Sequence, residues 1–495
     1  MVLAVGAFAA VASANDHDWP MYGRDASHTF ATNSQIDKRS VSRLQLAWSF
    51  TPGDTVSASP AIVDGTVYVG SWDGYFYALD EHAGTVKWKL ALDCDSMSNP
   101  QPARCVALGY PATDPLVRQG TDGGVVTSSA AVVDGTVYFG GGKTLYAVRA
   151  RDGHVLWKKV LCGNPDARHC EDDPNDPVRI FSSPTVYRGN VYVGSDVDGA
   201  AGYRGRIWAI DANRGSTAWT FEVDPNVDSH GHVQRGAQNR GCGNVWSSAA
   251  IDEDSHRVIF TTGDCQFTAA TPYHEAILAL DANNGDLAWA FRPIPAANTC
   301  DFDFGASANI IDTDGKHLIG AGNKNGTYYA LRPRDGVLAW STNVVFGGSD
   351  GGFVGTAAFD GKQIYGATLY GDGGFGASPL CDPSNPADSF IQDPSFHAFD
   401  VRTGAVVWQQ FANYAASATV VTNGVVISGT LGLGADLAPA VRFFDATNGN
   451  VLFELPQTGG VASAAVVTGN QVTFGTGNSY DGSGASIQAW RVGPR

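Results

Sequence analysis

A phrase of sequence that recurs along nearly the whole chain constrains the fold of these 495 residues most strongly. In its first copy, Ser59–Ala61 is followed by Asp64–Tyr68, then by Tyr77–Asp80, and finally by Gly84 and Trp88. A repeat of this size is one supersecondary unit that cannot bury its apolar face alone. The chain is therefore predicted to form a repeat architecture, stacked in a row or closed into a ring.

The copies can be counted from their endings, because each ends with a turn glycine and, four residues later, an aromatic residue. Seven complete endings are present: Gly84 and Trp88, Gly153 and Trp157, Gly215 and Trp219, Gly285 and Trp289, Gly336 and Trp340, Gly404 and Trp408, and Gly449 and Phe453. Near the N-terminus, Trp48 stands without a repeat body, whereas residues 461–491 form a body without its last strand. The two fragments complement each other, which makes eight units.

Each unit is predicted to contain four strands. Val132–Phe139 is a hairpin of β-branched runs around Asp134-Gly135, Tyr146–Val148 is a third strand, and Leu156–Lys158 is a fourth. The fold class is therefore all-β: an eight-bladed β-propeller of four-stranded antiparallel blades, with the last blade closed by the N-terminal strand. The repeated tryptophans are expected to pack between blades.

The apolar segment Met1–Ala14 ends in Ala12-Ser13-Ala14, a small-residue cleavage pattern. We therefore expect a signal peptide at residues 1–14, a single propeller domain at residues 15–495, and a secreted or periplasmic location. No later stretch is long and apolar enough to span a bilayer. The net charge of −17 argues against nucleic acid and anionic membranes as partners.

The eight cysteines are an even number in a chain expected to be exported, so they predict disulfides. Many connectivities are possible, and pairs that are near in sequence suggest themselves: Cys94 with Cys105, Cys162 with Cys170, Cys242 with Cys265, and Cys300 with Cys381. The chain has no Cys-x-x-Cys-His motif, so no haem is expected to be attached covalently.

Unusual residues gather where the first strand of a unit begins and its second strand ends, two points that lie side by side in a hairpin. In the fourth unit, Trp246 stands near the first point and Asp264 at the second. In the fifth unit, Asp301 and Asp303 precede the first strand, and Lys324 follows the second. Each residue also has an ordinary role as a packing, turn or surface residue. Together, an indole, carboxylates and an ammonium at one mouth of the channel suit a flat, anionic, redox-active ligand.

At these positions, and at Trp19–Asp25 and Val41–Trp48, the chain resembles the quinoprotein alcohol dehydrogenases that bind pyrroloquinoline quinone (PQQ). Within them it looks most like the polyvinyl alcohol dehydrogenase branch, and the resemblance covers the chain after residue 15. It implies oxidation of primary or secondary hydroxyls, with polyvinyl alcohol or a related polyol as an expected substrate. Electrons would pass to an external acceptor such as cytochrome c.

The resemblance also implies residue roles. Cys300–Asp303 matches the family's Trp-Asp-Phe-Asp motif, which makes Asp301 the catalytic base and Asp303 an additional metal ligand. Lys324-Asn325-Gly326 matches an Arg/Lys-Asn-Gly motif, so Lys324 would assist at the reactive quinone carbonyl and Asn325 would help bind the cofactor. Trp246 would stack on the quinone ring.

A Ca²⁺ or lanthanide ion would be held by Asp264, Asp301 and Asp303. Asp264 replaces the family's asparagine, and carboxylate oxygen still suits a hard cation. Ala200 stands where the family has a metal-binding glutamate, which removes one ligand; Asp198 or Asp303 are candidates to replace it.

Two other functions remain open. One is a scaffold of the bacterial envelope that binds no cofactor, and the other is a degenerate quinoprotein that binds sugars or polymers without oxidising them. Ala200 favours the scaffold, whereas the combination of Trp246, Asp301 and Lys324 disfavours it.

Overall fold

The computed structural model describes residues 17–92, 126–164, 176–197, 203–223, 243–264, 273–294, 301–313, 315–348, 351–369, 395–411, 415–432, 438–478 and 482–494. The expected signal peptide lies outside these ranges, as do seven of the eight cysteines. Cys162 is buried and is not a free thiol. The four disulfide pairings therefore stay predictions.

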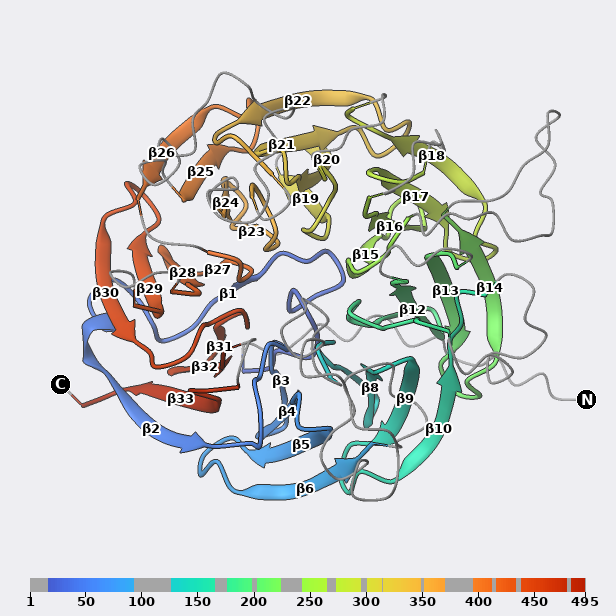
Figure 1. The fold of residues 1–495 in the computed structure, drawn as a ribbon. Helices are drawn as coiled ribbons and strands as arrows, with labels where there is room; N and C mark the ends of the chain where they lie inside the picture. The colour runs from blue at the N-terminus through green and yellow to red at the C-terminus, as the bar shows by residue number, and fades with distance from the viewer. Residues whose placement is uncertain are drawn as a thin grey trace, which may run out of the picture.

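The described strands form eight sheets arranged as a ring of blades (Figure 1). Blade 1 contains β3 (Ala61–Val63), β4 (Thr66–Gly70), β5 (Tyr75–Asp80) and β6 (Val86–Ala91); blade 2 contains β7 (Ala131–Val133), β8 (Thr136–Gly141), β9 (Thr144–Arg149) and β10 (Val155–Val160); blade 3 contains β11 (Thr185–Tyr187), β12 (Asn190–Ser195), β13 (Arg206–Asp211) and β14 (Thr217–Glu222); blade 4 contains β15 (Ala250–Asp252), β16 (Arg257–Thr261), β17 (Ile277–Asp281) and β18 (Leu287–Phe291).

The second half of the ring follows the same order, and the strand named first for each blade lies nearest the central channel. Blade 5 contains β19 (Asn309–Thr313), β20 (Lys316–Gly322), β21 (Thr327–Leu331) and β22 (Leu338–Asn343); blade 6 contains β23 (Ala358–Phe359), β24 (Gln363–Ala367), β25 (Phe396–Asp400) and β26 (Val406–Gln410); blade 7 contains β27 (Val420–Thr422), β28 (Val425–Gly429), β29 (Ala440–Asp445) and β30 (Val451–Pro456); blade 8 contains β31 (Val466–Thr468), β32 (Gln471–Thr476), β33 (Ser486–Val492) and β2 (Leu44–Phe50).

The eighth blade confirms the predicted closure. Its outermost strand, β2, comes from the N-terminal part of the chain and pairs antiparallel with β33, with Leu44 opposite Val492 and Phe50 opposite Ile487. The hairpin turns are also as predicted, since Asp134 (φ 48°) and Gly135 (φ 73°) both adopt the left-handed backbone of a two-residue turn. Within the described ranges the helical structure is the three-residue η1 (Val41–Arg43), and no helix there is long and apolar enough to cross a membrane.

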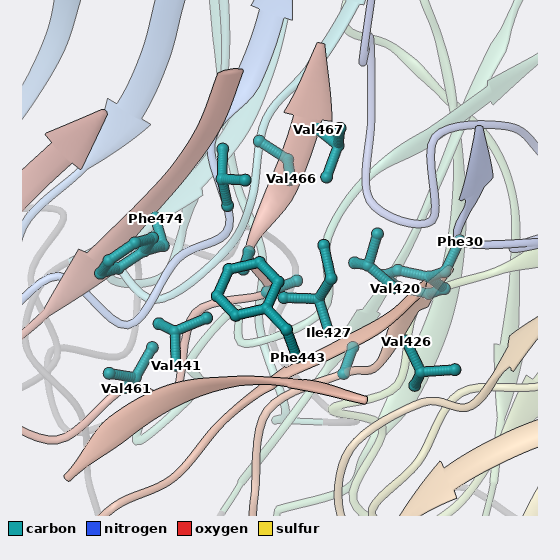
Figure 2. Close-up of a cluster of buried hydrophobic side chains, with 14 of the residues drawn as sticks. Phe30, Val420, Val426, Ile427, Val441, Phe443, Val461, Val466, Val467 and Phe474 are labelled. Atoms are coloured by element: carbon teal, nitrogen blue, oxygen red, sulfur yellow. The ribbon is translucent and has the colours of Figure 1, made fainter. Parts of the chain in front are cut away.

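Apolar side chains fill the space between neighbouring blades. Figure 2 shows one such cluster, in which Ile427 and Phe443 of blade 7 lie close to Val466 and Phe474 of blade 8. All four side chains are fully buried. Ring closure thus buries both faces of every blade, as a closed all-β array requires.

The repeated glycine and tryptophan form the joint between blades. The indole N–H of each tryptophan donates to a carbonyl of the next blade, as from Trp219 to Ala282 (3.1 Å) and from Trp289 to Pro333 (2.8 Å). The ring of Trp219 covers Gly285, where an added Cβ would lie 2.6 Å from the indole. Gly285 also has a φ of 77°, so the turn needs glycine for both space and conformation. The predicted packing role of these tryptophans is confirmed.

We expect Gly285→Ala to lower the free energy of unfolding by about 2–4 kcal/mol, because it combines a left-handed backbone with overpacking against Trp219. Gly315→Ala is the matched control: Gly315 has a φ of 80°, but nothing lies within 4 Å of its added Cβ. Urea unfolding should show a loss of only about 1–2 kcal/mol for the control. Equal losses of unfolding free energy in the two variants would contradict the packing of Trp219 against Gly285.

The segment formed by residues 19–32, here called the floor segment, closes one end of the channel. Its backbone hydrogen-bonds to the innermost strands of blades 1, 2, 4, 5, 6 and 7, through Ile62, Val132, Ile251, Ile310, Phe359 and Val421. It ends in β1 (Ala31–Thr32), which pairs parallel with β27. In Figure 1 this blue segment crosses the centre of the ring. Within the described residues, the floor segment therefore covers one end of the channel.

His28 anchors the floor segment and makes it sensitive to acid. The side chain is fully buried, its Nδ1 bonds to the Ala308 carbonyl (3.1 Å), and burial lowers the pKa of His28 to about 4. An unfolded histidine titrates near 6.5, so between these values the unfolded chain binds more protons and stability falls as the pH falls. We expect His28→Gln to remove up to about 3 kcal/mol of the stability difference between pH 7.5 and 4. Urea unfolding at both pH values tests this, with His82→Gln, an exposed histidine, as the control.

Candidate functional site

At the mouth of the channel, one pair of described residues is joined by a backbone hydrogen bond in each of six blades. One member of each pair stands six residues before the first residue of the inner strand, and the other follows the second strand by one or two residues. The backbone hydrogen bonds run from Trp72 to Thr55, Asp196 to Arg179, Gly263 to Asn244, Lys324 to Asp303, Leu369 to Gly352, and Gly477 to Gly460. The two ends of each hairpin thus meet as the sequence predicted, and blades 3 and 5 carry a charged pair there.

Blades 4 and 5 bring five of the six predicted site residues together. The Lys324 Nζ lies 2.9 Å from the Asp301 Oδ2 and 3.0 Å from the Asp303 Oδ1. It also lies 4.6 Å from the centre of the Trp246 ring, a cation–π distance. Asp264 joins through its backbone N–H, which donates to the Asp303 Oδ2 (3.0 Å). The five residues are called the mouth cluster below.

Three carboxylates crowd this small volume. One oxygen from each of Asp264, Asp301 and Asp303 lies within 4.8 Å of the others. Burial raises the pKa of Asp264 to about 7, with the charge of Asp301 adding to it and Lys324 opposing it. Burial also raises the pKa of Asp303, again opposed by Lys324. Negative charge is therefore under-compensated here, a condition that a bound cation relieves.

Lys324 remains a cation in this environment. It is only 4% exposed, and burial on its own would lower its pKa, but the carboxylates of Asp303 and Asp301 raise it above the ordinary value. The ammonium therefore supplies a fixed positive charge beside the indole of Trp246.

Asp301 differs from the other two carboxylates. Its side chain is 29% exposed, and its Oδ1 has no hydrogen-bond partner among the described residues, whereas Oδ2 is bound by Lys324. Its φ of 53° lies in the left-handed region, which costs energy for a residue with a Cβ. The strained backbone thus carries a carboxylate whose buried Oδ1 has no donor among the described residues.

The sixth predicted residue, Asn325, lies in the turn that carries Lys324. Its carboxamide donates to the Tyr329 hydroxyl (2.8 Å) and accepts from the Thr327 N–H (2.9 Å). Both partners belong to the same hairpin, so these bonds shape the turn. Contact of Asn325 with a cofactor stays a prediction, and Ala200 lies outside the described residues.

Sequence reasoning missed a second charged pair at the mouth. Arg179 and Asp196 of blade 3 lie 3.3 Å apart and are both nearly buried. They occupy the positions of Asp303 and Lys324 with the signs exchanged. The signal is present in the sequence, because each residue stands at the same offset from the repeat phrase as its counterpart.

The mouth cluster fits the groups that the resemblance implies. An indole face with a cation beside it suits a flat anionic ring, and the unbonded Asp301 oxygen is a vacant acceptor. Three carboxylates supply the hard oxygen donors that Ca²⁺ and related ions prefer.

Two proteins with similar sequences are named polyvinylalcohol dehydrogenases. A polyvinylalcohol dehydrogenase of Sphingopyxis sp. (strain 113P3) is 25% identical over 416 residues, which covers 77% of this chain and 56% of that protein. A polyvinylalcohol dehydrogenase of Pseudomonas sp. is 24% identical and covers 96% of this chain and 72% of that protein. The chain thus spans little more than half of the first relative's length.

Solved structures share the fold. Quinohemoprotein alcohol dehydrogenase from Comamonas testosteroni superposes with a TM-score of 0.74 at 20% identity, over 98% of this chain and 82% of that chain. A europium-containing methanol dehydrogenase reaches 0.74 at 19% identity, over 96% and 98%. BamB from Moraxella catarrhalis reaches 0.54 at 13% identity, over 90% and 97%.

The family model described as "PQQ: Glucose/ethanol/alcohol dehydrogenase, beta-propeller domain" matches residues 19–343, which is more than half of the chain and includes the whole mouth cluster. The chain therefore belongs to this family of PQQ dehydrogenase propellers.

Proposed function

We propose that the protein is a PQQ-dependent dehydrogenase that oxidises primary or secondary hydroxyl groups. The observation that carries the proposal is the mouth cluster: a buried ammonium, a partly open carboxylate and an indole from two adjacent blades meet at one opening. A scaffold propeller has no use for this costly arrangement of buried charge.

When bound, PQQ would supply an acceptor for the hydride that leaves the alcohol carbon. The chain's own residues do the remaining work. The Oδ1 of Asp301 accepts the hydroxyl proton as the C–H bond breaks, which is general-base catalysis. The Lys324 ammonium donates an N–H to the oxygen on which negative charge develops. The Trp246 face fixes the plane of the ring so that donor and acceptor carbons are aligned.

A divalent or trivalent cation would be held by Asp264, Asp301 and Asp303. Its charge would lower the repulsion among the carboxylates and keep all three ionised. Ca²⁺ and lanthanide ions both accept such oxygen donors.

We further propose that the substrate is polyvinyl alcohol or a related polyol, and that electrons leave to an external acceptor such as cytochrome c. The names of the relatives support the substrate class, at about 25% identity. A channel covered at one end by the floor segment suits oxidation of a hydroxyl presented at the other end by a chain that stays outside. Because a signal peptide is expected, we propose that this reaction takes place in the periplasm or outside the cell.

Reconstitution tests the proposal directly. Purified protein is incubated with PQQ alone, with PQQ and Ca²⁺, and with PQQ and La³⁺. Alcohol oxidation is then followed with an artificial electron-accepting dye, using a secondary alcohol, a diol and polyvinyl alcohol. We expect quenching of tryptophan fluorescence by PQQ and turnover that depends on the metal. Absence of both quenching and turnover under all three conditions would favour the scaffold function instead.

A further inference from the structure

Below the mouth cluster, hydroxyl groups of successive blades form a ring around the channel. The ring consists of one hydroxyl residue from each of six blades: Ser59, Ser129, Ser183, Ser248, Ser307 and Thr356. Each hydroxyl oxygen accepts a backbone N–H from the preceding blade, at 2.9–3.0 Å. The last two blades have Ala418 and Ala464 at this position. We call the six residues the hydroxyl ring.

This bonding leaves the hydroxyl protons for another partner. A serine hydroxyl has one proton to donate and two lone pairs, and a backbone N–H already occupies one of the lone pairs. Thr356 lies 2.9 Å from the Tyr22 hydroxyl, and Ser307 also interacts with Tyr22. For the other four serines, no acceptor of the hydroxyl proton lies among the residues that the structure describes. Accepting an N–H also polarises an O–H and makes it a stronger donor.

The hydroxyl ring faces a cavity of about 160 Å³ in the channel axis. Tyr22 of the floor segment lines its lower end, and Trp246, Phe181, Ser57 and Thr127 line the layer above the ring. The Trp246 Nε1 is buried and has no acceptor within the described ranges. Ser57 resembles the ring serines, since its oxygen accepts the Trp72 indole N–H at 2.9 Å.

The lining is rich in donors and poor in acceptors. Its described side chains are hydroxyls, aromatic rings and small apolar groups, with no carboxylate, carboxamide or imidazole among them. Water molecules filling the cavity would each bring two more protons, whereas each oxygen of the hydroxyl ring keeps only its second lone pair to accept one. An ion that only accepts hydrogen bonds fits this balance better. A liquid water occupies about 30 Å³, so the volume holds a small ion with a few waters.

We propose that this cavity is a binding site for a small monovalent anion of halide size, held by hydroxyl ring protons and by the indole N–H of Trp246. The ion would lie beneath the indole, away from the mouth carboxylates, and would tie together blades whose donors converge on the axis. The site does not depend on the proposed dehydrogenase activity.

Bromide is the probe. Crystals grown in sodium bromide should show an anomalous difference peak inside the cavity, next to the serine oxygens. In solution, sodium bromide should raise the Tm saturably relative to sodium gluconate at equal ionic strength, because gluconate is too large to enter. A cavity without an anomalous peak, or identical Tm curves in the two salts, overturns the proposal.

A matched pair of double variants identifies the binding groups. Ser129→Ala/Ser183→Ala removes two hydroxyls of the ring. Ser128→Ala/Ser182→Ala removes the neighbouring serines, which also accept backbone N–H groups, from Gly140 and Gly194, but do not line the cavity. Alanine already occupies the ring position in two blades, so the first variant is expected to fold.

Each charge-assisted hydrogen bond lost should weaken bromide binding about tenfold. The ring variant should therefore lose the bromide effect on Tm, and the control should keep it. Equal loss in both variants would show that the hydroxyl ring is not the binding group, which also overturns the proposal.

Discussion

Asp301→Asn is expected to lower turnover with PQQ and metal by about 10²- to 10⁴-fold, the usual contribution of a general base. The amide retains the size of the carboxylate and still accepts the hydrogen bond from Lys324, so the fold should be intact. It cannot accept a hydroxyl proton. PQQ affinity, measured by quenching of tryptophan fluorescence, should change much less than turnover.

Asp264→Asn separates the base from the metal ligands. It restores the amide that the resemblance predicts at this position, and it leaves the vacant Asp301 oxygen untouched. This variant should keep most of its turnover at saturating metal. If Asp301→Asn were as active as the native protein, Asp301 would not be the base. If both variants lost activity equally and excess metal restored both, Asp301 would be only a ligand.

The second large effect concerns Lys324. Lys324→Met removes the one cation that contacts Asp303 among the described residues, and the Asp303 side chain is fully buried. A buried carboxylate without its partner is expected to cost about 3–5 kcal/mol of stability. Turnover should also fall, because the N–H that stabilises the developing charge is lost. Urea unfolding at pH 7.5 and dye-linked activity measure the two effects.

The double variant Lys324→Met/Asp303→Asn distinguishes stability from chemistry. Neutralising Asp303 removes the unpaired charge, so most of the lost stability should return, while turnover should remain below that of Asp303→Asn alone. Recovery of both properties would mean that Lys324 serves the fold only. A Lys324→Met protein as stable as the native chain would contradict the ion pair described at the mouth.

Repetition explains why so much of this molecule was predictable. Since each blade reuses the same hairpin, the offset of Trp246 or Lys324 from its repeat phrase determines its depth in the channel. The gathering of Asp264, Asp301 and Asp303 follows from the same rule. Position alone did not reveal that Lys324 contacts two of these carboxylates at once, because that depends on side-chain direction.

The features that escaped prediction do not repeat or are held by cooperation between blades. The floor segment has no periodic pattern, and its bonds run to strands that are hundreds of residues away, such as the one from Val421 to Phe30. The hydroxyl ring exists only once neighbouring blades have docked, because each hydroxyl accepts an N–H from another blade. Arg179 and Asp196 pair within one blade, but their importance emerges only beside the mouth cluster.

The pairing of β2 with β33 has a consequence for biosynthesis. The strand that completes the eighth blade leaves the ribosome hundreds of residues ahead of its partner. During that interval the edge of Leu44–Phe50 that later pairs with β33 has no partner strand. Ring closure is therefore a late step that pairs strands far apart in the sequence. The nascent protein is vulnerable to aggregation until β33 has been made.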